Sequence, residues 1–342
     1  MNDLVALRSP RPLVWVAGDA VVPAAIAAAG ERAARRFLEF FAATIRNRNT
    51  REAYYRAACS FFAWLDPHGI TDLADIEPIH VAAYIEALQA TAAKPTVKQH
   101  LAAVRMLFDW LVVGQVLAIN PAHAVRGPKH VVKGGKTPVL MADDARRLLD
   151  SIAITRRLKR EDGSEVEAPD LVGLRDRALI AVMTYSLARV GAVVGMRVED
   201  YYPQGKRWWL RLHEKGGKRH EMPAHHNLEA YLDAYIDAAG LRRQGKTPLF
   251  RSAVWHSGTL TVEPMHRVDA YRMVRRRTAA AGFTQKLGCH TFRATGITAY
   301  LDGGGSLENA QAMAAHESPR TTKLYDRTGD EITLDEVERI KI

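Results

Sequence analysis

The 342-residue sequence has few of the features that stabilise secreted proteins or anchor proteins in membranes. Its only cysteines, Cys59 and Cys289, lie far apart, which is typical of a reducing compartment and argues against a disulfide framework. No run of about 18 uninterrupted apolar residues occurs, so we expect no transmembrane helix. The apolar stretch 13–29 is interrupted by Asp19 and Pro23, which argues against a signal peptide. The sequence therefore predicts a cytoplasmic protein that does not associate with membranes.

Clusters of metal ligands are also scarce. The nearest approach to a zinc site is His225 and His226 together with His220. This pair precedes a predicted helix and lacks a third ligand at a recognised spacing. We therefore expect no bound metal and no cofactor.

The sequence contains the pattern of a phosphate-binding loop, but the elements predicted around it are not those that the loop requires. Gly240–Thr247 (GLRRQGKT) matches the ATPase loop pattern at every position. That loop functions only between a preceding strand and a following helix, whose N-terminal amides hold the phosphates. Here a helix is predicted before it, over 228–239, and Pro248 favours an extended chain after it. We therefore expect no ATP site.

The charge balance favours a polyanionic partner. The chain has 48 Lys and Arg against 38 Asp and Glu, a net charge of +10, and basic proteins gain affinity for nucleic acid by releasing counterions from phosphates. Charge alone leaves the partner open, because other basic proteins bind no DNA. The length suits two domains, each with its own core.

The first of these domains is predicted to be a four-helix domain over 31–122, after an N-terminal extension over 1–30. Thr50 is a candidate N-cap for the second helix, the turn residues 66–69 end that helix, and Pro78 can open the third. Apolar residues at three- and four-residue steps place the helices near 31–46, 50–65, 78–90 and 95–113.

The segment 123–137 is predicted to be an extended linker, because it contains glycine and proline but no acidic residue. Its basic residues suit an extended segment that lies along DNA, although an ordinary solvated linker has the same composition. They are Arg126, Lys129, Lys133 and Lys136.

The second domain, over 138–332, mixes helices with a small sheet. Residues Arg207–His213 are rich in strand formers, and a Gly-Gly turn follows before the chain returns over Lys218–Met222. The resulting antiparallel hairpin carries Lys215 at its tip. The polar segment Arg156–Asp170 is predicted to be an exposed loop between two helices. The predicted fold is therefore mainly α with a small antiparallel β-sheet.

Candidate catalytic side chains gather between Cys289 and Arg327. His290 and Arg293 lie three residues apart, which places both on one face of a helix. His316 is followed nine residues later by Tyr325. By itself each pattern is weak, since a histidine, an arginine or a tyrosine often has only a structural role.

A new helix is predicted directly before the tyrosine. Ser318 can be its N-cap and Pro319 its first residue, so the helix should carry Arg320–Arg327 with Tyr325 in its second turn. Farther back, Arg189 stands in a small, apolar stretch where a guanidinium needs a partner. A phosphate or an acid elsewhere in the fold can supply that partner.

Taken in order, these residues resemble the tyrosine recombinase family of the phage integrase type over nearly the whole chain. The resemblance implies a core-binding, SAM-like DNA-binding domain at 31–122 and an α+β catalytic domain at 138–332, which together clamp duplex DNA. The chain departs from the family at Ala192, where an acid often stands three residues after the first arginine, and at Ala294, where a second histidine is frequent. The implied catalytic set is Arg189, Lys215, His290, Arg293, His316 and Tyr325.

The resemblance also implies the chemistry. Tyr325 attacks a DNA phosphodiester to form a 3′-phosphotyrosine bond and release a 5′ hydroxyl, while His290 accepts the tyrosine proton and Lys215 protonates the leaving oxygen. The intermediate keeps the phosphodiester energy, so religation needs neither ATP nor a metal. The non-bridging oxygens are bound by Arg189, Arg293 and His316.

Contacts to double-stranded DNA are predicted from basic residues on helix faces and in the linker, any of which can instead be a solvated charge. At the C-terminus, Leu334, Val337 and Ile340 form an apolar stripe in a tail over 333–342 that suits docking on a neighbouring protomer of a homotetramer. The candidate DNA contacts are Arg48, Arg51, Tyr54, Lys98, Arg105, Lys133, Lys136, Arg272, Arg275 and Arg276.

The predicted function is site-specific DNA recombination that integrates, excises or resolves a mobile element. A type IB topoisomerase-like enzyme shares the tyrosine chemistry but need not pair two DNA molecules. A DNA-binding regulator without catalysis is a second alternative, and the retention of all six catalytic candidates argues against it.

Overall fold

The structure is a computed structural model that describes residues 14–15, 21–130, 135–214, 217–254 and 257–326. Lys133, Lys215 and the tail over 333–342 lie outside the described residues. The chain divides into two compact units, Met1–Val131 and Val132–Ile342. This boundary lies within the segment 123–137, whose described residues form neither helix nor strand.

The N-terminal unit is helical, and all four predicted helices are present. A short additional helix precedes them, and a π-helical turn over Phe40–Thr44 prolongs the first of the four. Two 3-10 turns, Asp66–His68 and Leu73–Asp75, follow the second. The elements are β1 Val14–Trp15, β2 Val21–Val22, α1 Ala24–Ala28, α2 Glu31–Glu39, α3 Arg48–Leu65, α4 Pro78–Thr91 and α5 Lys94–Val113.

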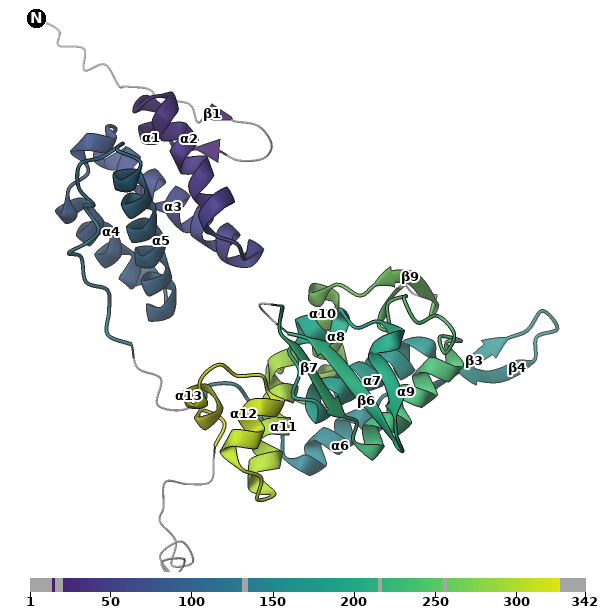
Figure 1. Cartoon of the computed structure of the whole chain (residues 1–342). Helices are drawn as coiled ribbons and strands as arrows, with labels where there is room; N and C mark the ends of the chain where they lie inside the picture. Colours follow the sequence, from purple (N-terminus) through teal and green to yellow (C-terminus); the bar gives the residue numbers. More distant parts are fainter. Residues whose placement is uncertain (1–13, 16–20, 131–134, 215–216, 255–256, 327–342) are drawn as a thin grey trace, which may run out of the picture. The chain divides into compact units, whose positions relative to one another are not determined.

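The core of this unit is rich in aromatic rings. Helices α3 and α5 pack side by side (Figure 1). Phe61 of α3 meets Tyr84 of α4 and Phe108 of α5 edge to face, with ring centroids 5.2 and 6.0 Å apart. The prediction for the start of α3 was wrong. Asn47 caps the helix by accepting from the backbone amide of Thr50, three residues on.

The C-terminal unit contains the predicted mixture of helices and small sheets. A 3-10 turn, Val198–Asp200, leads into the largest sheet. The elements are α6 Ala142–Asp150, β3 Thr155–Lys159, β4 Glu165–Pro169, α7 Leu171–Tyr185, α8 Val190–Val194, β5 Tyr201–Gln204, β6 Arg207–His213, β7 Arg219–Pro223, α9 His226–Ala238, β8 Arg251–Ala253, β9 Leu260–Pro264, α10 Arg267–Ala280, α11 Cys289–Asp302, α12 Leu307–Met313 and α13 Pro319–Lys323.

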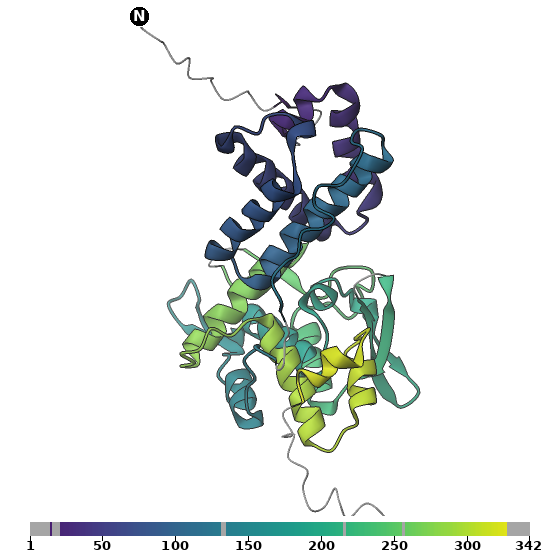
Figure 2. The ribbon, with the colours of Figure 1, turned by 90° about the vertical axis from the view of Figure 1, so that its left-hand side faces the viewer.

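The largest sheet is antiparallel, in the order β5-β6-β7. Because side chains alternate along a strand, Leu210 and Leu212 of β6 point into the core that they share with α7 and α9, whereas Arg211 and His213 face outward. The predicted hairpin is thus confirmed, and β5 extends it to three strands. Helices α11, α12 and α13 gather at one side of the unit (Figure 2, lime to yellow).

Helix α11 lies close to α7 because a glycine permits it. A Cβ atom on Gly296 would lie 2.0 Å from the carbonyl oxygen of Thr184, the residue before the last of α7. Only glycine fits this contact. The approach places the first turns of α11, which carry the candidate His290 and Arg293, beside the chain that leaves α7.

Two surface segments, Arg156–Asp170 and Gly240–Thr247, lie outside the sheet and helices described above. The predicted loop Arg156–Asp170 is instead the hairpin β3–β4, which projects from the rest of the unit (Figure 1) and pairs Leu158 with Val166. Its strands are mostly exposed, so no apolar alternation marks them in the sequence. Around Gly240–Thr247, α9 precedes and β8 follows, which is the predicted order. Among the described residues, none of the helices is both long and apolar enough to cross a bilayer.

Candidate active site

Arg293 lies at the centre of the candidate site. It projects from α11, is 1% exposed, and donates hydrogen bonds to the carbonyl oxygens of Leu187 and Ala314. These acceptors lie next to left-handed backbone: Leu187 itself has φ 56°, and Ala315 has φ 46°. Non-glycine residues rarely adopt this conformation, so local strain is stored on both sides of the guanidinium.

The charge of Arg293 is held in a desolvated environment. Burial lowers its pKa to about 10, and the nearby charge of Arg189 acts in the same direction. The group still stays protonated at neutral pH. Its Nε atom is buried and has no hydrogen-bond partner among the residues that the structure describes. Because a buried unpaired donor is costly, this N–H group is suited to receive an anion.

Arg189 precedes α8 as its N-cap residue and is 36% exposed at its side chain. Its Nη1 atom lies 2.6 Å from Oε2 of Glu214, a residue that is 6% exposed. The partner required by the sequence argument is therefore an acid from the end of β6. Sequence reasoning did not identify Glu214, although two-residue alternation from Leu210 and Leu212 places it on the buried face.

The candidate nucleophile Tyr325 follows α13 rather than lying within it. The predicted helix over Arg320–Arg327 was too long, because α13 ends at Lys323. The turn continues through a hydrogen bond from the Tyr325 amide to the Thr322 carbonyl oxygen at 2.9 Å. A second bond, from Thr298 Oγ1 to the Tyr325 carbonyl oxygen at 3.1 Å, ties this turn to α11.

The Tyr325 side chain is directed at His290. Its hydroxyl lies 2.6 Å from Nε2 of His290, and only 8% of the residue is exposed. Burial raises the tyrosine pKa, while the charges of Arg293 and Arg189 lower it in part. The loss of hydration lowers the pKa of His290, and Arg293 and Arg189 lower it further. His290 is therefore neutral at pH 7 and able to accept a proton.

His316 also lies beside the tyrosine, its ring nearly parallel to that of Tyr325 with centroids 5.9 Å apart. Its Nδ1 atom lies 2.9 Å from the hydroxyl of Thr322, which fixes the ring orientation. Burial lowers the His316 pKa to about 4, and the charges of Arg293 and Arg189 contribute. The neutral ring can donate from Nε2 when Nδ1 accepts the threonine proton.

The structure thus brings five of the six catalytic candidates together, and Lys215 lies outside the described residues. Its neighbours are placed: Gly217 has φ 79°, a turn conformation that glycine adopts readily. Lys218, which also flanks the turn, is exposed and lies 3.5 Å from Glu317, the residue after His316.

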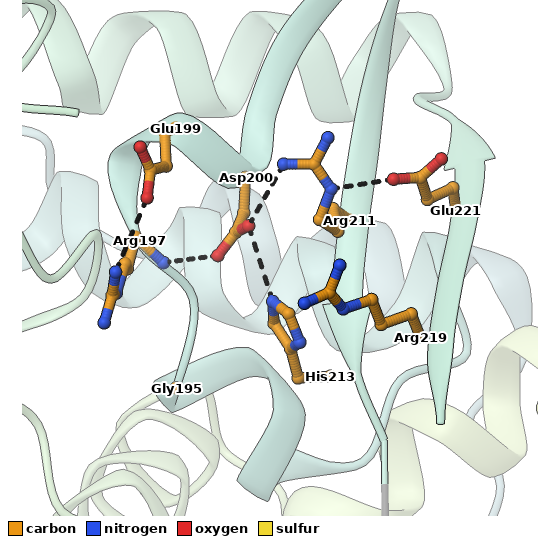
Figure 3. A pocket seen from close by; sticks show the side chains of 8 residues that line it. All are labelled: Gly195, Arg197, Glu199, Asp200, Arg211, His213, Arg219 and Glu221. Atoms are coloured by element: carbon orange, nitrogen blue, oxygen red, sulfur yellow. Dashed lines mark hydrogen bonds and ion pairs between the residues drawn. The ribbon is translucent and has the colours of Figure 1, made fainter. Parts of the chain in front are cut away.

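The outer face of the β5-β6-β7 sheet holds a separate cavity of about 570 Å³ (Figure 3). Asp200 lies 3.8 Å from Arg211 and 3.6 Å from His213, while Arg211 pairs across strands with Glu221 at 2.7 Å. Acidic and basic side chains are mixed in this cavity. Arg211 and His213, which line it, alternate along β6 with the buried Leu210 and Leu212.

The candidate DNA contacts are spread over both units. Several guanidinium groups already bond within the protein: Arg51 donates to the carbonyl oxygen of Ile45, and Arg105 donates to those of Ala122 and Val125. The α10 candidates Arg272, Arg275 and Arg276 bond to Asp269, Leu287 O and Asp176, respectively. Exposed and free of an assigned ion pair in the described structure are Arg48, Lys98 and Lys136.

His225, one of the histidines considered for zinc, has another role. His225 is the N-cap of α9 and accepts from the Asn227 amide, and its ring stacks on Tyr185 and His226 with centroids 4.5 and 4.1 Å apart. Within the described residues, no three His, Cys, Asp or Glu side chains are grouped as metal ligands.

Comparison with known families agrees with this geometry. A model of the phage integrase family matches residues 143–331, and a model of the phage integrase N-terminal SAM-like domain matches residues 34–114. The first match spans more than half of the chain. The protein therefore belongs to the phage integrase family of tyrosine recombinases, and its activity is the site-specific cleavage and rejoining of DNA.

Individual relatives are distant but cover most of the chain. The tyrosine recombinase XerD of Mycobacterium leprae is 28% identical over 291 residues, 81% of this chain and 86% of the relative. The tyrosine recombinase XerC of Escherichia coli O127:H6 is 28% identical over 232 residues, 66% of this chain and 67% of the relative. Neither the topoisomerase-like alternative nor the catalytically silent regulator is favoured.

Solved structures share the fold. A lambda integrase dimer bound to a COC′ core site has a TM-score of 0.64 at 17% identity, covering 88% of this chain and 97% of that one. XerH bound to a palindromic difH substrate also has a TM-score of 0.64, at 16% identity, with coverage of 85% and 90%. The predicted fold class, a SAM-like helical domain followed by a mainly helical catalytic domain with small antiparallel sheets, is confirmed.

Proposed function

We propose that Tyr325 is the nucleophile that attacks a DNA phosphodiester and forms a 3′-phosphotyrosine bond. The hydrogen bond of 2.6 Å between its hydroxyl and His290 Nε2 carries this assignment. Burial raises the pKa of Tyr325, so the phenol needs a base to react at neutral pH. His290, whose pKa is lowered, accepts that proton as the P–O bond forms.

Two arginines supply the positive charge that binds the scissile phosphate. Arg293 is buried and held by two carbonyl oxygens, and its Nε hydrogen remains available. Arg189 is partly exposed beside it. Two planar guanidinium groups suit the developing charge on the non-bridging oxygens better than point charges do. His316, with its ring fixed by Thr322, supplies a further donor to the same oxygens.

The leaving 5′ oxygen needs a proton, and we assign the role of general acid to Lys215. In the sequence the lysine directly follows Glu214, whose carboxylate contacts Arg189. The reaction then balances: one P–O bond forms at Tyr325, one breaks at the 5′ oxygen, His290 gains a proton and Lys215 loses one. Religation by a 5′ hydroxyl reverses these steps without a nucleotide or a metal.

The partner of this chemistry is double-stranded DNA, bound by the SAM-like domain over 31–122 and the catalytic domain over 138–332, with the linker 123–137 between them. A lambda integrase of the same fold is a tetramer bound to a Holliday junction. We therefore propose a homotetramer on paired sites, with the tail over 333–342 docked on a neighbouring protomer. The setting is the cytoplasm, and the outcome is integration, excision or resolution of a mobile element.

Covalent trapping tests this function and identifies the DNA site in the same experiment. The full chain is incubated with a pool of nicked duplexes of randomised sequence, in excess chelator and without nucleotide. Denaturant-resistant protein–DNA adducts are then recovered and sequenced. We expect enrichment of one site with the parent chain. Tyr325→Phe should bind the selected duplex within about twofold of the parent and give no adduct, because only the nucleophilic oxygen is removed.

A strict requirement for Mg²⁺ or ATP in this assay would contradict the mechanism. Adducts that persist in Tyr325→Phe would assign the nucleophile to another tyrosine. Tyr300 and Tyr271 would then be tested next.

A further inference from the structure

Glu214 is a buried acid that no catalytic role yet explains. It follows β6 directly, two residues after Leu212, and the two-residue period of the strand turns it toward the core. Only 6% of the residue is exposed. Its backbone amide donates to the Lys218 carbonyl oxygen at 2.8 Å, which closes the base of the hairpin turn. Both strands therefore fix the position of its carboxylate.

The carboxylate contacts Arg189 twice. Oε2 accepts from Nη1 at 2.6 Å, and Oε1 lies 3.5 Å from the backbone amide of Arg189. A carboxylate that engages one edge of a guanidinium in this way holds its plane and leaves the other donors free. Because the arginine side chain is 36% exposed, the remaining donors are open to a phosphate.

The residue three positions after Arg189 cannot hold the guanidinium in this way. Ala192 has no carboxylate, is 5% exposed, and uses its backbone amide for a bond to the Arg189 carbonyl oxygen at 2.9 Å. The only acid that the described structure places in an ion pair with Arg189 is Glu214, which comes from a different element.

We propose that Glu214 is the positioning residue of Arg189, holding its guanidinium in the orientation that binds the scissile phosphate. This inference rests on the proposed function, in which Arg189 contacts that phosphate. The carboxylate also places a negative charge near the DNA, which by itself opposes phosphate binding. Positioning and repulsion therefore predict opposite effects on the cleavage rate when the charge of Glu214 is removed.

The test compares Glu214→Gln with Glu221→Gln in the full chain. Glutamine keeps the shape of the side chain but removes its charge. Glu221 is a matched control because it pairs with Arg211 on the same hairpin at 2.7 Å and faces the outer side of the sheet. Single-turnover cleavage is measured at saturating concentration of the selected nicked duplex, and the dissociation constant is measured separately. Thermal melting checks that each variant is folded.

Glu214→Gln should slow cleavage about tenfold or more, because hydrogen bonds to charged groups are stronger than neutral ones. Its dissociation constant for DNA should stay within about twofold of the parent, since many other phosphate contacts remain. Glu221→Gln should cleave at the parent rate. Unchanged or faster cleavage by Glu214→Gln would overturn the proposal, because the carboxylate would then only repel DNA.

Two further arms separate Glu214 from its neighbours. A duplex with sulfur at the bridging 5′ position has a leaving group that needs no proton, so it should not restore Glu214→Gln. Restoration would mean that Glu214 acts through Lys215 and not through Arg189. In the Arg189→Ala background, Glu214→Gln should cost nothing more, because the group that it positions is gone. Additive losses would overturn the proposal.

The same set distinguishes failure of the inference from failure of the proposed function. If Arg189→Ala cleaves at the parent rate, the phosphate role of Arg189 fails and the proposed mechanism fails with it. If Arg189→Ala is slow while Glu214→Gln is normal, only the inference fails. Should Glu214→Gln not fold, Glu214→Asp replaces it: the charge remains but the carboxylate withdraws by one methylene, so cleavage should slow. Full activity of that variant would refute positioning.

Discussion

Replacing His290 by glutamine removes the proposed base without removing a hydrogen-bonding side chain. Burial raises the Tyr325 pKa above its ordinary value of 10. At pH 7 fewer than about one molecule in 10³ then carries the phenolate unaided. The imidazole 2.6 Å from the hydroxyl allows the phenol to react without ionising first. We expect His290→Gln to cleave about 10² to 10⁴ times more slowly than the parent at pH 7.

The pH profile gives the sharper test. The pKa of His290 is lowered below 6.5, so the neutral base is already present at pH 7 and the parent rate should be nearly flat from pH 7 to 9. In His290→Gln the tyrosine must ionise by itself. Its cleavage rate should therefore rise about tenfold for each pH unit over the same range, because the phenolate fraction does so.

The assay is single-turnover cleavage of the selected nicked duplex at saturating DNA, followed as covalent adduct across the pH range. His213→Gln is the matched control, since this histidine lies on the outer face of the sheet, 3.6 Å from Asp200 (Figure 3). It should keep the parent profile. A His290→Gln rate within about threefold of the parent, or a profile as flat as that of the parent, would refute the assignment of the base.

Three further predictions concern other residues. The pKa of His316 is about 4 in the folded protein and 6.5 in the unfolded chain, so its protonation favours unfolding. Between pH 7 and 4.5, the free energy of unfolding from urea titrations should fall by about 2 kcal/mol more in the parent than in His316→Gln. Equal falls would contradict a buried neutral ring. Lys215→Ala should recover cleavage on the duplex with sulfur at the bridging 5′ position. Lys218 is exposed beside Glu317, so Lys218→Ala should keep much of its activity on ordinary DNA and gain little from the sulfur. The opposite pattern would transfer the general-acid role to Lys218. Deleting Thr333–Ile342 should leave binding to one site intact in gel-shift assays but impair recombination between two sites, and normal recombination would show that the tail is dispensable.

Part of the site follows directly from the sequence. The three-residue spacing of His290 and Arg293 places both on one face of α11, and the observed helix bears this out. Glu214 was accessible to the same kind of reasoning, because Leu210 and Leu212 already define the buried parity of β6. The strand parity shows that Glu214 is buried, but its pairing with Arg189 is a tertiary contact that strand periodicity does not specify.

Other features of the site cannot be predicted from residue types in the sequence. The carbonyl oxygens that hold Arg293 belong to Leu187 and Ala314, and main-chain acceptors carry no residue-type signal. The left-handed conformations at Leu187 and Ala315 lack the glycine that usually announces them. Tertiary contacts around Arg293 and Tyr325 select these conformations.

Local sequence signals are ambiguous where two residues can fill one role. Asn47 and Thr50 can both cap a helix, and in the structure the cap is Asn47, whose side chain accepts from the backbone amides of Asn49 and Thr50. The hairpin β3–β4 has exposed charges on both strands, so the usual alternation of apolar residues is absent. A polar hairpin of this kind cannot be told from a loop by periodicity.

The central claim is that Tyr325 forms the covalent bond to DNA. The most direct measurement is mass spectrometry of the trapped adduct: after nuclease trimming and proteolysis, the nucleotide-bearing peptide is sequenced by fragmentation. The account predicts a phosphate linkage on Tyr325 that carries the 3′ end of the cleaved strand. A nucleotide on any other residue, or a linkage to a 5′ end, would contradict it.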